Sequence, residues 1–240
     1  MSRTGSQKGT GRIDVRRFAD RSALESALVE RLVEAFEGPN TGVGVAVMLS
    51  GGSTPVPAYG ALARRGIRPA ADRYVLFSDE RHVPSDSEAS NFHQTRPLIA
   101  ALALPETRVL RVRTELPLEE AAADYERRLK AMLDAGVGIG LGLLGLGADG
   151  HTASLFSAAD LERGAGRLAI AVQRPDGRGA VSVTPRLLAR VATPVFVVAG
   201  ADKRDALERF LAGDPGSVAR QAVAACPHVE VWADREAYPA

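Results

Sequence analysis

The sequence predicts an α/β fold with a mostly parallel sheet and helices on both of its faces. Short apolar runs with strand character alternate with helical patterns along the 240 residues, and polar turns follow several of these runs. This alternation is typical of parallel strands joined through helices. No internal repeat or linker divides the chain, so we expect residues 13–240 to form a single α/β domain. Residues 1–12 are polar, glycine-rich and basic, which predicts a disordered tail.

The first half of the chain supplies three strands and three helices. Apolar residues recur every fourth position from Leu24 to Phe36, which suits one face of a helix that Ser22 caps. Pro55 stands at the favoured first position of a second helix, and Pro97 is expected to kink or shorten the third. The strands are expected at Ile13–Phe18, Val43–Leu49 and Tyr74–Phe77, and the helices at Ser22–Phe36, from Pro55 onward and at Asn91–Ala101.

The second half continues the alternation. Its most regular helical pattern, at Leu118–Leu133, is amphipathic. Asp202 is expected to cap a helix that ends at Leu211. The remaining strands are expected at Val109–Val112, Ile139–Leu144, Leu168–Val172, Ala180–Thr184, Val195–Ala199 and Val229–Ala233.

Composition and charge exclude several classes of protein. The net charge is +1, which does not predict a nucleic-acid surface, and the apolar runs are too short to span a bilayer. Cys226 is the only cysteine, so an intrachain disulfide is excluded and a reducing compartment fits. We expect a cytoplasmic protein with no membrane or nucleic-acid partner, as a monomer or a small homo-oligomer.

The segment Gly145–Phe156, with the sequence GLGADGHTASLF, carries the most informative pattern. It follows a predicted buried strand, where α/β proteins place reactive groups. It presents Asp149 and His151, and histidine can take up and return a proton near neutral pH. Asp149 could hold His151 in one tautomer or bind a ligand itself. Alternatively, Asp149 caps a helix and His151 is a surface residue. The two residues lack the partner spacing of a zinc site.

The turn that follows Leu49 has the features of an anion site. Gly51 and Gly52 precede a helix start, where free backbone N–H groups attract negative charge. Ser53 and Thr54 add hydroxyl donors. The lysine and spacing of a nucleotide-binding loop are missing, so a phosphate monoester is the expected ligand. A plain turn capped by a hydroxyl side chain is the alternative.

Charged side chains follow two further strands. Asp79 and Arg81 come after Tyr74–Phe77, and Arg81 could hold a phosphate or an oxyanion, or form a surface ion pair. Asn91 could bring an amide to the same place or cap a helix. Lys203 lies at a helix start, where the helix dipole disfavours a cation and an anion is therefore expected nearby. A solvated lysine is the alternative. Because parallel strands end at one edge, we expect these turns to form one pocket.

Together these segments resemble the family of glucosamine-6-phosphate isomerases and 6-phosphogluconolactonases. The resemblance rests on LSGGSTP at Leu49–Pro55, on SDERHVP at Ser78–Pro84 with Ser90–Phe92 after it, and on LGLGADGHTASLF at Leu144–Phe156, and a weaker match runs from Val181 through Arg186 to Lys203. It implies a Rossmann-like, deaminase/isomerase-like fold. It also implies hydrolysis of 6-phospho-D-glucono-1,5-lactone to 6-phosphogluconate in the oxidative pentose phosphate pathway.

Several positions separate the members of this family. Phe156 stands where the deaminases carry a glutamate, and Arg81 where they carry a tyrosine, and both favour a lactonase. Lactonases often have an arginine at the position of Ala180, for which Arg178 is a candidate replacement. A deaminase-like aldose–ketose enzyme and a non-catalytic sugar-phosphate-binding module are the alternative functions.

A lactone is an activated ester, so its hydrolysis requires no metal or cofactor. His151 is expected to take a proton from the water that attacks C1 and to return it to the ring oxygen. Arg81, helped by backbone N–H groups of the Gly147–Gly150 turn, is expected to stabilise the oxyanion, and Asp79 to hold Arg81 or contact the substrate. The residues expected to bind the substrate and its phosphate are Gly51, Gly52, Ser53, Thr54, Lys203, Asn91 and Arg186.

Overall fold

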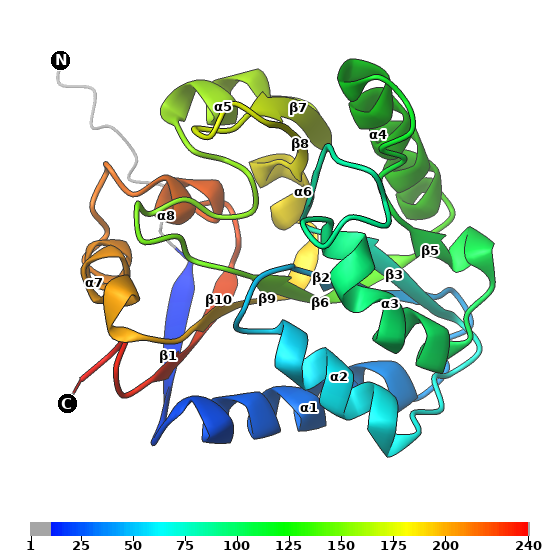
Figure 1. The fold of residues 1–240 in the computed structure, drawn as a ribbon, viewed down its shortest axis with the longest axis horizontal. Helices are drawn as coiled ribbons and strands as arrows, with labels where there is room; N and C mark the ends of the chain where they lie inside the picture. The colour runs from blue at the N-terminus through cyan, green and yellow to red at the C-terminus, as the bar shows by residue number, and fades with distance from the viewer. Residues whose placement is uncertain (1–10, 240) are drawn as a thin grey trace, which may run out of the picture.

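The structure of the chain, a computed structural model, describes residues 11–239. Its centre is a seven-stranded sheet in the order β1-β10-β9-β6-β2-β3-β5, in which every neighbouring pair is parallel (Figure 1). The strands are β1 (Arg12–Phe18), β2 (Val45–Leu49), β3 (Arg73–Phe77), β5 (Val109–Leu110), β6 (Gly138–Leu144), β9 (Val191–Val198) and β10 (His228–Asp234). The parallel sheet that the sequence predicts is therefore present.

Helices cover both faces of this sheet, as predicted. They are α1 (Arg21–Glu37), α2 (Val56–Arg65), α3 (Asn91–Leu102), α4 (Leu118–Asp134), α5 (Ala158–Arg163), α6 (Pro185–Leu188), α7 (Arg204–Leu211) and α8 (Val218–Ala222), with short 3-10 turns at Glu106–Arg108 and Ala201–Lys203. Within residues 11–239, none of the helices is both long and apolar enough to cross a membrane.

The pleat of the strands divides the core into two clusters. In β2, Val47 and Leu49 face one side and pack with α1, α2 and α3. Ala46 and Met48 face the other side, with α4, α6, α7 and α8. All four side chains are fully buried, and burying a Val, Leu or Met side chain contributes about 1.5–3 kcal/mol. A strand buried on both faces reads as a continuous apolar run, which is why β2 is visible in the sequence.

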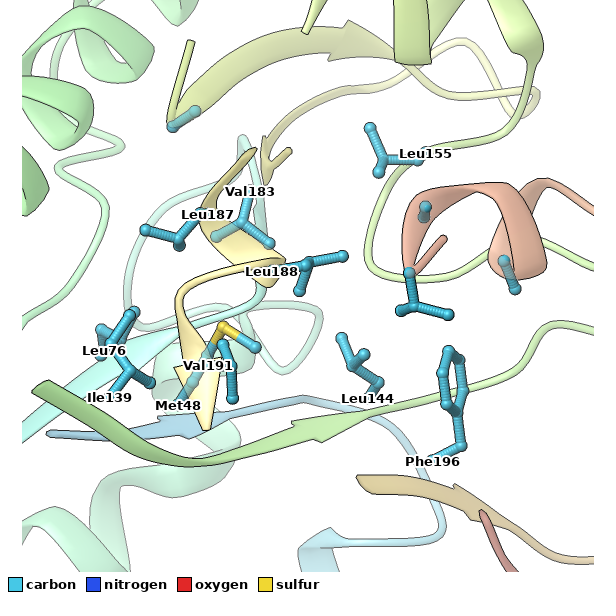
Figure 2. Close-up of a cluster of buried hydrophobic side chains, with 14 of the residues drawn as sticks. Met48, Leu76, Ile139, Leu144, Leu155, Val183, Leu187, Leu188, Val191 and Phe196 are labelled. Carbon is cyan, nitrogen blue, oxygen red and sulfur yellow. The ribbon is translucent and has the colours of Figure 1, made fainter. Parts of the chain in front are cut away.

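Three further strands form a second, antiparallel sheet in the order β4-β8-β7, which the sequence analysis did not predict. These strands are β4 (Asp79–Arg81), β7 (Ala169–Gln173) and β8 (Gly179–Val183). A five-residue connection, residues 174–178, joins β7 to β8, and such a short connection permits antiparallel pairing only. Figure 2 shows apolar side chains of β8 and α6, among them Val183 and Leu188, facing Met48 of the parallel sheet.

Several predicted boundaries differ from the structure. Asp20, not Ser22, caps α1, because its carboxylate accepts from the N–H of Ala23 at 2.8 Å. Pro97 does not shorten α3, which continues to Leu102 because the residues beyond the proline pack in the core. Most of the predicted tail lies outside the described residues, but Arg12 belongs to β1, where its N–H donates to the carbonyl of Pro227 at 3.0 Å.

Candidate functional site

The four turns singled out in the sequence meet at one edge of the parallel sheet. They follow β9, β6, β2 and β3, which are consecutive neighbours in the sheet, so their carboxyl ends lie side by side. The turns enclose a cavity of about 260 Å³. Its lining includes Ser50, Gly51, Gly52, Ser53, Thr54, Asp79, Arg81, Asn91, Gly147, His151, Arg174 and Lys203. Nearly all of the residues proposed from the sequence are thus brought together.

His151 enters the cavity with Asp149 behind it. The Nδ1 atom of His151 lies 2.5 Å from Oδ1 of Asp149, and the backbone N–H of His151 donates to the same oxygen at 3.2 Å. Burial raises the pKa of Asp149, but the hydrogen bond from His151 and its charge outweigh burial and hold that pKa below its usual value. A carboxylate only accepts hydrogen bonds, so Nδ1 carries the proton and Nε2 of the neutral ring is left as the base.

The backbone around His151 is shaped for this contact. A Cβ on Gly147 would lie 2.1 Å from Nδ1 of His151 and 2.4 Å from Oδ1 of Asp149, so only glycine fits there. Gly150 has a φ of +86°, a left-handed backbone conformation that glycine adopts more easily than other residues. The ring of His151 packs on that of Phe156 with centroids 4.5 Å apart. The histidine is therefore held by a hydrogen bond, a close turn and an aromatic neighbour.

The N–H groups of this turn are less available than the sequence analysis expected. Gly147 donates its N–H to the carbonyl of His151, and Gly150 donates to the carbonyl of Gly147, both at 2.9 Å. These two groups close the turn on itself and cannot also serve a ligand. Stabilisation of an oxyanion by this turn therefore stays a prediction, with Ala148 and Asp149 as the residues whose N–H groups are left for it beside Arg81.

Asp79 lies at the cavity wall, whereas its neighbour Glu80 does not line the cavity. The carboxylate of Asp79 accepts from the hydroxyls of Ser78 at 3.0 Å and Ser154 at 2.7 Å, which fix it at the cavity wall. Its expected contact with Arg81 is not among the hydrogen bonds or ion pairs of residues 11–239. Instead, Asp79 presents its free lone pairs to the cavity as an acceptor.

Glu80 points away from the cavity and caps α3. Its two carboxylate oxygens accept from the N–H groups of Asn91 and Phe92, both at 2.7 Å, and from the hydroxyl of Ser90 at 3.1 Å. Burial and, to a smaller extent, the charge of Asp79 raise the pKa of Glu80 to about 7 against the lowering effect of these N–H donors. Glu80 thus ties β4 to the start of α3, which places Arg81 and Asn91 beside each other at the cavity.

Arg81 and Asn91 both keep polar atoms without protein partners at this site. Arg81 donates from Nη1 to the carbonyl of Ala89 at 2.8 Å, and its buried Nε is unpaired among the described residues. Asn91 donates from Nδ2 to the carbonyl of Asp79 at 2.9 Å, while its buried Oδ1 is also unpaired within residues 11–239. Ser90, not Asn91, is the cap residue of α3, so the amide of Asn91 is available to a ligand.

The turn after β2 is held in shape by its neighbours. A Cβ on Gly51 would lie 1.9 Å from Oδ1 of Asn91, and Gly52 has a φ of +103°, so glycine is required at both positions. The N–H of Gly52 faces Oε1 of Gln94 at 3.3 Å, a long contact that an anion would replace. The guanidinium of Arg21 contacts the carbonyl of Ser53 from outside. Ser53 and Thr54 line the cavity at the start of α2.

Lys203 also lines the cavity, from the turn after β9. Asp202 does not cap α7, because a 3-10 turn at Ala201–Lys203 precedes this helix and Lys203 itself is the residue before its first turn. The carboxylate of Asp202 pairs with Nζ of Lys203 at 3.1 Å. Lys203 therefore stands at a helix start as predicted, with a cavity in front of it.

One cation of the cavity was missed and another was misplaced. Arg174, which follows β7, lines the cavity, and its position after a predicted strand is the signal that could have identified it. Arg186 is not among the lining residues: it lies on α6, and its guanidinium donates to the carbonyl of Gly166. Arg178, the candidate replacement for the arginine missing at position 180, is exposed and pairs with Asp176.

Known proteins with similar sequences and structures share this arrangement of strands and helices. The family model for glucosamine-6-phosphate isomerases/6-phosphogluconolactonase matches residues 19–232. The 6-phosphogluconolactonase of Synechocystis sp. is 36% identical and covers 79% of this chain and 80% of its own length. That of Thermotoga maritima is 35% identical, covering 70% and 76%. A crystal structure of 6-phosphogluconolactonase from T. maritima matches with a TM-score of 0.75 at 28% identity, covering 92% of this chain and 98% of its own.

Proposed function

The chain belongs to the family of glucosamine-6-phosphate isomerases and 6-phosphogluconolactonases, and we propose on this basis how its cavity performs catalysis. The enzyme is a lactone hydrolase that converts 6-phospho-D-glucono-1,5-lactone to 6-phosphogluconate in the oxidative pentose phosphate pathway. The observation that supports the mechanism best is the contact between Asp149 and Nδ1 of His151 at the wall of a cation-lined cavity.

His151 acts as the base. Its Nε2 atom removes a proton from a water molecule, which attacks C1 of the lactone. The tetrahedral intermediate then expels the ring oxygen, and the imidazolium returns the proton to that oxygen as the C1–O bond breaks. Asp149, ionised at neutral pH because its pKa is lowered, stabilises the imidazolium between these two steps. General acid–base catalysis of this kind contributes about 10²- to 10⁴-fold to the rate.

Arg81 stabilises the negative charge that develops on the carbonyl oxygen. Its anchoring through Nη1 to the carbonyl of Ala89 fixes the direction of the guanidinium, and a preorganised donor of this kind costs no reorganisation during the reaction. Since Gly147 and Gly150 donate within their own turn, Arg81 carries this task without them.

The remaining polar groups bind the rest of the substrate. Asp79 accepts from a sugar hydroxyl, because both of its carboxylate oxygens are already oriented by serine hydroxyls. The unpaired Oδ1 of Asn91 accepts from another hydroxyl. The phosphate lies at the start of α2, with Gly51, Gly52, Ser53, Thr54 and Lys203 as its ligands. Binding this non-reacting end fixes C1 against His151.

The proposal also places the enzyme in the cytoplasm, which suits a chain with one, buried cysteine. The test is hydrolysis of freshly prepared 6-phospho-glucono-δ-lactone, measured by proton release and corrected for the spontaneous reaction in buffer. We expect strong acceleration with this substrate and none of the ammonia release from glucosamine 6-phosphate that a deaminase would give. Ammonia release without lactone hydrolysis would overturn the proposal.

A further inference from the structure

The hairpin that joins β7 to β8 carries a cation which the proposed mechanism does not use. Arg174 comes directly after β7, lines the cavity, and keeps only 18% of its side chain exposed. We propose that Arg174 binds the phosphate of the substrate directly. This inference rests on the proposed function, since it assigns a residue to the same substrate.

The register of the hairpin determines the face on which the side chain of Arg174 lies. Val172 pairs with Ala180 and Gln173 with Gly179, and the N–H of Arg174 donates to the carbonyl of Arg178 at 2.9 Å. Directly paired residues of antiparallel strands point to the same face, as do residues two apart along a strand. Val172, Ala180, Arg174 and Arg178 therefore share one face of the hairpin, and Ala180 pairs in turn with Arg81 of β4. Of the two hairpin arginines, Arg174 lines the cavity. Arg174 thus lies on the same face as position 180, two pairs closer to the turn.

The contacts of Arg174 hold its guanidinium over the cavity. Its Cζ atom lies 5.3 Å from the ring centroid of Phe156, a stacking geometry that favours a planar cation. Nη1 donates to the hydroxyl of Ser154 at 3.4 Å, and Nε pairs with Asp176 at 3.5 Å. A guanidinium has five N–H donors in a planar fork that matches phosphate. These two contacts leave three of the donors for a ligand.

The charge of the cavity favours a dianion as that ligand. Arg81, Arg174 and Lys203 line it together with one carboxylate, Asp79, so the lining holds more cations than anions. Asp176 and Asp202 pair with Arg174 and Lys203 from outside the lining. A phosphate monoester carries about −1.5 to −2 at pH 7. The transition-state oxyanion carries a single charge and is already served by Arg81. Arg174 and Lys203 are thus the lining cations left for the phosphate.

Arg178 provides a matched control from the same turn. It has the same side chain and pairs with the same carboxylate, Asp176, at the same distance of 3.5 Å. However, 57% of its side chain is exposed, and it is not among the residues that line the cavity. A general effect of charge or of turn stability would appear in variants of either arginine, whereas phosphate binding would appear only at Arg174.

The test compares Arg174→Ala, Arg174→Lys and Arg178→Ala with the natural protein. We expect Arg174→Ala to raise KM for 6-phospho-glucono-δ-lactone by about 10- to 100-fold, the range for loss of a hydrogen bond to a charged group, with kcat changed by less than threefold. The lysine variant should recover part of this loss, and Arg178→Ala should retain the natural KM. A fall in kcat at unchanged KM would instead show that Arg174 acts on the reacting centre, and the assignment would be wrong.

Binding of the product, 6-phosphogluconate, measured by titration calorimetry separates this inference from the proposed function. Arg174→Ala should weaken binding by a similar factor, while Arg178→Ala should not. If the natural protein binds the product but accelerates no hydrolysis, the proposed function fails while the assignment of Arg174 stands. Equal affinity of the natural protein and Arg174→Ala would refute the assignment whatever the catalytic activity.

Discussion

The two sheets contribute to the cavity in different ways. The parallel sheet supplies His151, Lys203 and the glycine turn from loops that directly follow its central strands. The antiparallel sheet supplies Asp79 and Arg81 from within β4, and Arg174 from the end of β7. We infer that the parallel sheet provides the base and the phosphate turn with Lys203, whereas the antiparallel sheet provides Arg81 for the oxyanion and Arg174 for the phosphate.

This difference shows which parts of a site are encoded locally. A residue on a loop after a parallel strand lies at the carboxyl edge of the sheet, because all parallel strands end at that edge. This placement does not depend on residues far away in the sequence. Asp79 and Arg81 of the antiparallel sheet also follow a parallel strand, β3, but pairings distant in the chain, such as Asp79 with Ser182, fix their orientation. Arg174 reaches the cavity from the hairpin between β7 and β8. Variants in the loops of the parallel sheet should therefore change mainly catalysis, whereas variants in the antiparallel sheet should also change stability.

The largest of these effects is expected at Gly147, in the loop of the parallel sheet. Gly147→Ala would place a Cβ against His151 and Asp149, so the ring must move. A displacement of about 1 Å at a reacting group costs about 10²-fold in rate, so kcat should fall by this order while circular dichroism stays unchanged. Gly138→Ala on β6, where an added Cβ meets nothing within 4 Å, is the control. Equal kcat values for the two variants would mean that the position of the imidazole does not limit the reaction.

In the antiparallel sheet, titration of Glu80 should make the free energy of unfolding depend on pH. Burial raises its pKa from 4.5 to about 7, so the folded state binds this proton more tightly than the unfolded chain does. Its contribution to stability is greatest below about pH 4.5 and is lost as the pH rises to about 7, on the order of 3 kcal/mol in total. Urea unfolding between pH 4.5 and 8 should show this decline, and Glu80→Gln should reduce it.

The test compares how steeply the free energy of unfolding falls with pH in the natural protein and in Glu80→Gln. If both lose stability with pH to the same extent, then Glu80 does not titrate in this range. The link that it makes between β4 and α3 would then be maintained by an ionised carboxylate at all these pH values, with its N–H donors outweighing burial.

The smallest effect is expected at Arg186, which lies near the antiparallel sheet but outside the cavity. Its recorded partner is the exposed carbonyl of Gly166, so Arg186→Ala should change the free energy of unfolding by less than about 0.5 kcal/mol. KM and kcat for the lactone should stay at natural values. A clear rise in KM would show that Arg186 binds the phosphate after all. It would contradict the conclusion that Arg174 lies at the cavity and Arg186 does not.

The comparison also explains how far the sequence could predict the molecule. The strands that carry His151 and the glycine turn are apolar runs followed by polar residues, a pattern that is visible locally. The pairing of Asp79–Arg81 with β8 is not visible in this way, because three polar residues do not look like a strand until Val181 and Ser182 lie beside them.

The errors at the site have the same origin. Arg186 was assigned from resemblance, and only the structure shows that its side chain turns to Gly166. Arg174 was overlooked although it comes shortly after the predicted strand Leu168–Val172, because only the hairpin register shows that this strand end lies at the cavity. The closed turn between Gly147 and His151 depends on backbone hydrogen bonds that composition does not reveal.

The most direct test of the account is the turnover number of His151→Ala with 6-phospho-glucono-δ-lactone. The parallel sheet is proposed to provide the base, held by Asp149 at 2.5 Å, and the phosphate site does not depend on it. We therefore predict that kcat falls by about 10²- to 10⁴-fold while affinity for 6-phosphogluconate is retained. A kcat near that of the natural protein would contradict the central claim that His151 activates the attacking water.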